Sequence, residues 1–333
     1  PAGWGCGLAP PQAPWGVGGA GGRPPPYPLG PGVAARPGPA TTGAHLRYSR
    51  ERSTSTNHDG MDDIHPIAPD KRAAILSTLA DIEQRYDVRV LLACESGSRG
   101  WGFSSPDSDY DARFIYVHRQ PWYLSVNEST GPGEAQRDVI ELPIDDELDV
   151  SGWDLRKALR LVSKSNPTLI EWLRSPIVYQ QDQAAVSQLW EAAKAFHSPL
   201  GTWWHYFNMA RSNHRGYLRG ETVRTKKYLY VLRPLLACQW IEHEQTPPPM
   251  AFEDLLDRLL PDGAVREVID ALLAVKRASA EVAAGPRIAA ISDYIDRELA
   301  IRTAQAPQLP AGRGDAAWLD ELFRQMLAEH APA

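Results

Sequence analysis

Two aspartates separated by one residue, placed just before an apolar run, constrain this chain of 333 residues more than any other feature. Asp109 and Asp111 precede the apolar run 114–117, and a second apolar run, 90–94, lies upstream. Alternate side chains of a β-strand point to the same face, so the two carboxylates are expected to point the same way. Converging carboxylates repel each other unless a cation lies between them, and Mg²⁺ prefers oxygen ligands of this kind. The stretch therefore predicts a site for Mg²⁺ or Mn²⁺ between two strands.

A Gly-Ser pair lies between the two apolar runs. Gly97 and Ser98 follow the first run, and ten residues separate Ser98 from Asp109. Backbone N–H groups and a hydroxyl just past a strand end can bind an anion. A phosphate site beside a metal site, within one strand–loop–strand unit, is the apparatus of phosphoryl or nucleotidyl transfer.

This stretch resembles the nucleotidyltransferase superfamily typified by DNA polymerase β, whose pattern is an apolar strand, Gly-Ser, a loop and Asp-x-Asp. The wider sequence is similar to one bacterial and phage family, the predicted nucleotidyltransferases of the RNA repair pathway polymerase β type. The matching segments are DYDARFIYV, ELDVSGWDLRKAL, SNPTLIEWLRSPIVY and KKYLYVLRPLLA, and the resemblance covers residues 65 to 300 or so. It implies an α/β (α+β) nucleotidyltransferase domain with a small mixed sheet, followed by an all-helical C-terminal domain.

A third strand carboxylate completes the superfamily pattern, and several acids lie close enough in sequence to supply it. Asp149, flanked by apolar residues in the segment 148–150, fits a strand position facing the first pair. Glu141 is the alternative ligand. Asp154 is expected instead to cap the helix that follows it. Asp107 lies in Pro-Asp-Ser, which is typical of a turn, and is a candidate for supporting the first pair.

A local excess of positive charge lies in the second half of the chain. Residues 211–233 hold seven Arg or Lys and one acid, in a chain with a formal net charge of -6. Lys226, Tyr230 and Arg233 recur at helical spacing and are expected to share one face. The cations would neutralise nucleotide phosphates, and Tyr230 would stack on a base. Two alternatives stay open, namely Lys227 in place of Lys226, and a solvated helix face for the whole cluster.

The composition excludes some classes of protein. The chain is 43% hydrophobic and 23% charged, and its apolar runs are shorter than the ~20 residues that span a membrane. Acidic residues outnumber basic ones by 41 to 35, so bulk DNA binding is not expected and any polynucleotide contact must be local. The widely spaced cysteines favour reduced thiols, with Cys94 and Cys238 in the core. Because no secretory signal pattern is seen, we expect a cytoplasmic location.

The chain is expected to have four parts. Residues 1–60 are rich in Pro, Gly and Ala and are predicted to be a disordered leader, with Met61 as a candidate start. Residues 61–180 would form the nucleotidyltransferase catalytic domain and residues 181–305 a helical domain. Residues 306–333 would be a linker and a C-terminal amphipathic helix.

Hydrophobic periodicity predicts the individual elements. A helix is expected to begin at Pro69, with Asp70 as its N-cap. Strands are predicted at 88–95, 112–117, 139–142 and 147–150. Ser151 and Gly152 are expected to end the last of these strands. Further helices are predicted at 183–196, 200–218, 223–244, 251–259, 263–284 and 287–304.

Together these features predict metal-dependent transfer of a nucleoside monophosphate from an NTP, such as ATP, to an acceptor hydroxyl. Asp109 and Asp111 would hold two Mg²⁺ ions, and Asp149 would complete the second metal site. Gly97 and Ser98 would hold the β- and γ-phosphates. The acceptor stays open between an RNA end, a small molecule and a protein hydroxyl, as does the oligomeric state. The alternatives are a nucleotide-sugar glycosyltransferase that uses Asp-x-Asp and a nucleotide-binding regulator without catalysis.

Overall fold

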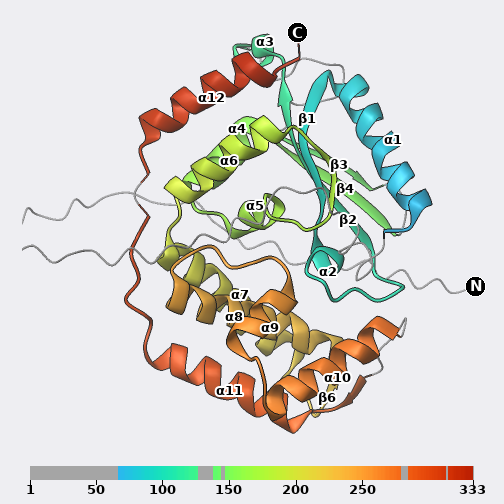
Figure 1. Cartoon of the computed structure of the whole chain (residues 1–333), viewed down its shortest axis with the longest axis vertical. Helices are drawn as coiled ribbons and strands as arrows, with labels where there is room; N and C mark the ends of the chain where they lie inside the picture. The colour runs from blue at the N-terminus through green and yellow to red at the C-terminus, as the bar shows by residue number, and fades with distance from the viewer. Residues whose placement is uncertain (1–66, 127–137, 144–146, 279–283, 313, 333) are drawn as a thin grey trace, which may run out of the picture. The chain divides into compact units, whose positions relative to one another are not determined.

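The chain divides into two units, Pro1–Ser55 and Thr56–Ala333, and only the second contains residues that the structure describes. The computed structural model describes residues 67–126, 138–143, 147–278, 284–312 and 314–332, all within the second unit (Figure 1). The predicted leader, residues 1–60, lies outside the described residues, as does Cys6. The proposed boundary between residues 180 and 181 stays a prediction.

A mixed sheet of five strands, in the order β3-β4-β2-β1-β5, forms the first part of the fold. Its strands are β1 (Val88–Glu95), β2 (Tyr110–His118), β3 (Val139–Pro143), β4 (Leu148–Asp154) and β5 (Val178–Gln181). Strands β2 and β4 run parallel, and the other neighbouring pairs run antiparallel. The small mixed sheet expected from the sequence is confirmed, and β5 is an addition to it.

Strand β4 is longer than predicted. It continues through Ser151 and Gly152 to Asp154, so the expected end of the strand at these two residues is wrong. The ring of Phe114, on neighbouring β2, occupies the space where a side chain at position 152 would begin, with its nearest atom 2.2 Å from an added Cβ. Glycine here allows close packing between strands rather than a turn. Asp154 caps the next helix by accepting from Arg156 N, as predicted.

Helices cover both faces of the sheet, as Figure 1 shows. Helix α1 (Pro69–Tyr86) packs one side through Ile75, Leu79 and Ile82. The opposite side packs against α4 (Leu155–Ser163), α5 (Pro167–Trp172), α6 (Gln183–Ala195) and the last helix, α12 (Ala316–His330). Short α2 (Gly97–Gly100) and α3 (Gln120–Tyr123) follow β1 and β2. The alternating burial of β1 and β2 side chains against two different cores explains why both strands are apolar throughout.

The start of α1 differs from the prediction in one detail. Ala68 occupies the N-cap position, and no side chain caps the helix. Asp70 lies in the first turn, not at the cap, because Pro69 already has the fixed φ that suits the first helical position. Its charge still lies near the positive end of the helix dipole.

A second hydrophobic core is built from helices. They are α7 (Pro199–Tyr217), α8 (Leu229–Glu244), α9 (Phe252–Leu259), α10 (Ala264–Ala278) and α11 (Ala289–Ala304). Phe103, from the loop after α2, is fully buried in this core and so anchors that loop to the helices. Cys94 and Cys238 are both buried and free, as predicted. No described helix combines the length and the apolar character needed to cross a membrane.

The segment predicted as one helix from 223 to 244 is three elements. Strand β6 (Thr222–Arg224) pairs with β7 (Ala284–Pro286), and the 3₁₀ turn η1 (Thr225–Tyr228) leads into α8. The pairing with a distant strand, which local periodicity cannot reveal, overrides the helical pattern. As a result Lys226 lies before α8, and it does not share a helical face with Tyr230 and Arg233.

Candidate active site

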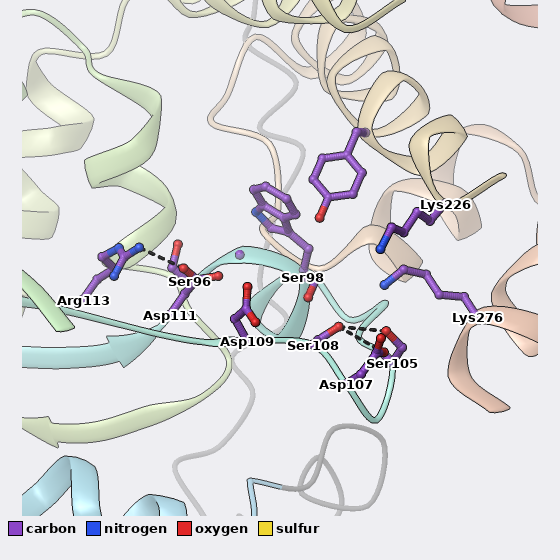
Figure 2. A pocket seen from close by; sticks show the side chains of 13 residues that line it. Ser96, Ser98, Ser105, Asp107, Ser108, Asp109, Asp111, Arg113, Lys226 and Lys276 are labelled. Carbon is purple, nitrogen blue, oxygen red and sulfur yellow. Dashed lines mark hydrogen bonds and ion pairs between the residues drawn. The ribbon is translucent and has the colours of Figure 1, made fainter. Parts of the chain in front are cut away.

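A cavity of about 460 Å³ lies between the segment that joins β1 to β2 and the helical core (Figure 2). From the sheet side it is lined by Ser96, Gly97, Ser98, Trp101, Ser105, Asp107, Ser108, Asp109, Asp111 and Arg113. From the helical side it is lined by Lys226, Tyr230 and Lys276. Seven residues singled out from the sequence therefore meet here: Gly97, Ser98, Asp107, Asp109, Asp111, Lys226 and Tyr230. Asp149 and Arg233 are not among the lining residues.

Gly97 fits tightly against Asp111. Its φ is +57°, a left-handed conformation that favours glycine, and an added Cβ would lie 2.0 Å from Asp111 Oδ2. The chain then enters α2, and the first N–H groups of a helix have no partner within the helix. Ser98 closes the loop by accepting from Phe103 N through its carbonyl. The turn thus presents free backbone donors next to a carboxylate.

The two aspartates lie where β2 begins. Tyr110, between them, is buried in the core, so Asp109 and Asp111 face the cavity together. Burial raises the pKa of Asp111; the nearby Arg113 charge opposes this rise, and the charges of Asp149 and Asp109 add to it. Mutual repulsion between acids is what a bound cation relieves.

Glu95 fixes the start of β2 from the neighbouring strand. Its Oε1 accepts from Asp111 N at 2.8 Å, and Tyr179 donates to its other oxygen. The side chain is fully buried, and this burial raises the pKa of Glu95 to about 7. Glu95 therefore sets the position of the Asp111 backbone. Sequence reasoning missed this role, because an acid at a strand end is most often solvated.

Arg99 holds the other aspartate in place. Its Nη2 donates to Ser108 O at 2.7 Å and its Nε to Asp109 O at 3.2 Å. The guanidinium also lies over the Tyr110 ring, 3.9 Å from the ring centroid. Only 5% of Arg99 is exposed. This arginine directly follows the Gly-Ser pair, so it connects the Gly97–Ser98 turn to the segment that carries Asp109. Sequence reasoning missed this contact.

Asp149 lies beside Asp111 on the adjacent parallel strand. The two residues are register partners in the β2–β4 pair, whereas Glu141 is on β3, one strand further away. Arg113 joins the two acids: its Nη2 lies 2.8 Å from Asp111 Oδ1 and 2.8 Å from Asp149 Oδ2. This geometry favours Asp149 over Glu141 as the third carboxylate. Arg113 is a further residue that the sequence analysis did not select.

The donor set fits a hard divalent cation at Asp109 and Asp111. Both carboxylates line the cavity, and their oxygens are the ligands such ions take. Within the described residues no group of three metal-binding side chains is already assembled. Asp149 does not line the cavity, and one of its oxygens contacts Arg113.

Two lysines face the acids from the helical side. Figure 2 shows the amino groups of Lys226 and Lys276 directed toward Ser98, across the cavity from Asp109. Lys276, on α10, is 2% exposed and donates to Phe103 O at 2.5 Å. Burial, together with the neighbouring charge of Lys226, lowers the pKa of Lys276 to about 8. A single lysine in a long helix gave no signal in the sequence.

Lys227, the alternative to Lys226, points elsewhere. Its amino group lies over the rings of Tyr217 and Tyr230, at 4.4 and 4.8 Å from their centroids. It does not line the cavity, whereas Lys226 does. Tyr230 itself packs edge-on against Trp101. The geometry favours Lys226 as the residue that faces a bound anion.

Arg233 differs from its expected role. It is 3% exposed, its Nη1 pairs with Glu171 Oε1 at 3.0 Å, and its Nη2 donates to Met250 O at 3.1 Å. The guanidinium lies 4.7 Å from the Trp101 ring centroid, and Glu171 also accepts from Trp101 Nε1. We therefore leave Arg233 out of the nucleotide site. Arg233 instead packs against the Trp101 ring. Lys226 lies in η1 and Arg233 in α8, so the two cations do not share one helical face.

Comparison with known proteins agrees with this geometry. Residues 72–325 match the RNA repair pathway DNA polymerase beta family. The chain belongs to this family. Every residue that lines the cavity, from Ser96 to Lys276, falls inside the region matched to the family. The resemblance to a polymerase β-like nucleotidyltransferase family, and the fold it implied, are thereby confirmed.

The chain was also compared with individual proteins. The uncharacterized protein YcgL of Bacillus subtilis (strain 168) is 46% identical over 253 residues, which cover 76% of this chain and 94% of YcgL. A solved structure of a nucleotidyltransferase-like protein from Exiguobacterium sibiricum 255-15 is 11% identical and covers 68% of this chain and 75% of its own. Its TM-score is 0.25, too low to add to the description of the fold.

Proposed function

We propose that the protein transfers a nucleoside monophosphate from an NTP to an acceptor hydroxyl, with Mg²⁺ or Mn²⁺ held by Asp109 and Asp111. The observation that carries the proposal is the contact between Gly97 and Asp111, which puts an anion-binding turn and a metal-binding carboxylate side by side. Charge is also divided across the cavity, with acids on one wall and lysines on the other. A metal-bound triphosphate also has a positive and a negative part, so its metal ion would face the acids and its phosphates would face the lysines.

Each residue has a defined task in this proposal. The N–H groups of the Gly97–Ser98 turn and the Ser98 hydroxyl bind the β- and γ-phosphates. Lys226 and Lys276 neutralise the departing pyrophosphate. Tyr230 offers its ring to the base. The bound divalent ions would stabilise the entering and leaving oxygens at the α-phosphate.

The acceptor side of the site is assigned to Asp149. It lies next to Asp111 in the β2–β4 register, and Arg113 contacts both acids. Release of Arg113 from Asp149 would let this carboxylate orient the acceptor hydroxyl for in-line attack. Arg113 is then a positioning residue, since it acts through the two acids.

Two other functions account for fewer of the observations. A nucleotide-sugar glycosyltransferase needs Asp-x-Asp, but it needs neither the Gly97 turn nor a third strand carboxylate. A regulator that only binds nucleotide does not need an acid at the acceptor side. A cytoplasmic location and the absence of bulk DNA binding stay predictions.

The test is identification of the product. The protein is incubated with each NTP, labelled at the α-phosphate, together with Mg²⁺ or Mn²⁺ and either total RNA or cell extract. Mass spectrometry of RNA, protein and small molecules then locates the label. We expect one acceptor class to gain a mass of one NMP with release of pyrophosphate. Transfer of a sugar from a nucleotide sugar, with no NMP transfer, would overturn the proposal.

A further inference from the structure

A second cavity, of about 940 Å³, lies between helices α7 and α11. It is lined by Asn208, Arg211, Ser212, His214, Arg215 and Arg219 on one wall, and by Asp296, Leu299, Ala300, Thr303 and Ala304 on the other. None of these residues lines the candidate active site. We call this cavity the α7 groove. Its two walls differ in character: one is basic, and the other is mostly small or apolar.

The basic wall carries three arginines at four-residue spacing. Arg211 and Arg215 lie one turn apart, about 6 Å along the helix axis, and Arg219 continues the series just past the end of α7. All three are exposed. Helix α7 contains no Asp or Glu in its 19 residues, although the chain as a whole is acidic. The helix therefore concentrates positive charge on one side of an otherwise negative molecule.

The three arginines have no acidic partner among the described residues. Arg211 makes a cation–π contact with Phe207, and no ion pair forms at Arg215 or Arg219 in the part of the chain that the structure describes. The one acid lining the groove, Asp296, is already engaged by His214 and Arg287, each at 3.0 Å. The positive charge of the groove is thus left uncompensated inside the fold.

An exposed aromatic ring extends the same face of the helix. Trp204 is 41% exposed and precedes Arg211 and Arg215 by seven and eleven residues, which puts all three on one helical stripe. A tryptophan in line with arginines can stack on a nucleic-acid base while the cations contact the phosphates. The small side chains on α11 leave space for the flat base.

We propose that the α7 groove binds a single-stranded polynucleotide through its phosphate backbone, with Trp204 stacking on one base. The arginine series is longer than a single phosphate, so a chain of phosphates engages it better than a lone anion does. This inference does not depend on the proposed nucleotidyl transfer, because binding can be measured without turnover.

The test measures binding of a dye-labelled single-stranded RNA oligonucleotide by fluorescence anisotropy at several salt concentrations. Arg211→Ala/Arg215→Ala/Arg219→Ala should weaken binding by about tenfold or more. It should also reduce the slope of log K against log[salt] by about 2, since each single-strand phosphate contact contributes ~0.7. Trp204→Ala should weaken binding without changing that slope.

Two controls make the test specific. Lys164→Ala/Lys194→Ala/Arg324→Ala removes the same charge from exposed positions on the sheet side and should bind RNA like wild type. Asp109→Asn/Asp111→Asn should also bind RNA like wild type, which separates this site from the active site. Equal loss in the two triple variants would overturn the proposal. Binding of poly-glutamate as tight as that of the RNA would also overturn it, because it would mark a general site for anions.

Discussion

The carboxylate of Asp111 occupies the space in which any side chain at position 97 would begin. An added Cβ on Gly97 would lie 2.0 Å from Oδ2 and 2.9 Å from Cγ of Asp111. The Gly97 turn and the Asp111 carboxylate are therefore parts of one packed unit. A change in either residue must displace the other.

Replacement of Gly97 tests this coupling. Gly97→Ala should abolish measurable turnover, because the methyl group forces Asp111 away from the cavity. The positive φ adds a destabilisation of about 1–3 kcal/mol. Gly263 is the matched control, since its φ is +97° and an added Cβ there meets nothing within 4 Å. Gly263→Ala should lower the melting temperature and leave kcat unchanged; full activity in Gly97→Ala would contradict the coupling.

Arg113 should compete with a metal ion for the acids. In Arg113→Ala the charges of Asp111 and Asp149 lose the guanidinium between them, so the protein without metal should melt at a lower temperature. Added Mn²⁺ should then raise the melting temperature by more than it does in the wild-type protein. Arg113→Lys, which keeps the charge, should show a smaller change. Identical Mn²⁺-induced shifts in all three proteins would exclude competition.

The pH dependence of nucleotide binding should reflect Lys276. Burial lowers the pKa of Lys276 to about 8, and only the protonated form attracts a triphosphate. Affinity should therefore be full below this pKa and should decrease as the pH rises through it, seen as a rising KM for NTP. Lys276→Met should raise KM by about tenfold to a hundredfold at neutral pH and remove this dependence. A wild-type KM that stays constant from neutral pH to above the pKa would contradict a contact with the phosphates.

Arg233 should matter for stability, and Lys226 for binding. Removal of one partner from a buried ion pair leaves the other charge unpaired and costs about 3–5 kcal/mol. Arg233→Ala should therefore lower the melting temperature by roughly 6–20 °C. Lys226→Ala should leave the melting temperature unchanged and raise KM for the nucleotide. The opposite pattern in calorimetry and kinetics would restore Arg233 to the nucleotide site.

Sequence reasoning reached the parts of the site that lie close together along the chain. The residues from Gly97 to Asp111 form one strand–turn–strand unit, so their spacing alone indicates their geometry. Asp149 was also preferred to the acids of the turn before it, because its apolar neighbours mark a strand; its advantage over Glu141 comes from the β2–β4 register. The cavity residues confirm that Gly97, Ser98, Asp109 and Asp111 come together, although their chemical roles stay proposals.

The residues that were missed act across long distances in the sequence. Lys276 reaches the cavity only because Phe103 is buried in the helical core beside it. Arg233 lies in α8 as expected, but it pairs with the distant Glu171 and does not line the cavity. Arg99 and Arg113 lie next to recognised motifs, but their contacts depend on strand register. Contacts between residues far apart along the chain produce no hydrophobic periodicity in the local sequence, so pattern reading does not detect them.

The central claim is that Asp109 and Asp111 hold the metal for NMP transfer, and pyrophosphate release tests it most directly. Release is measured from NTP with Mn²⁺ and the identified acceptor, for wild-type protein and for Asp109→Asn/Asp111→Asn. The variant should keep the wild-type melting temperature or exceed it, since the substitution removes repulsion between the two acids. It should release no pyrophosphate above background, while wild type releases one for each NMP transferred. Wild-type release by the folded double variant would contradict the account.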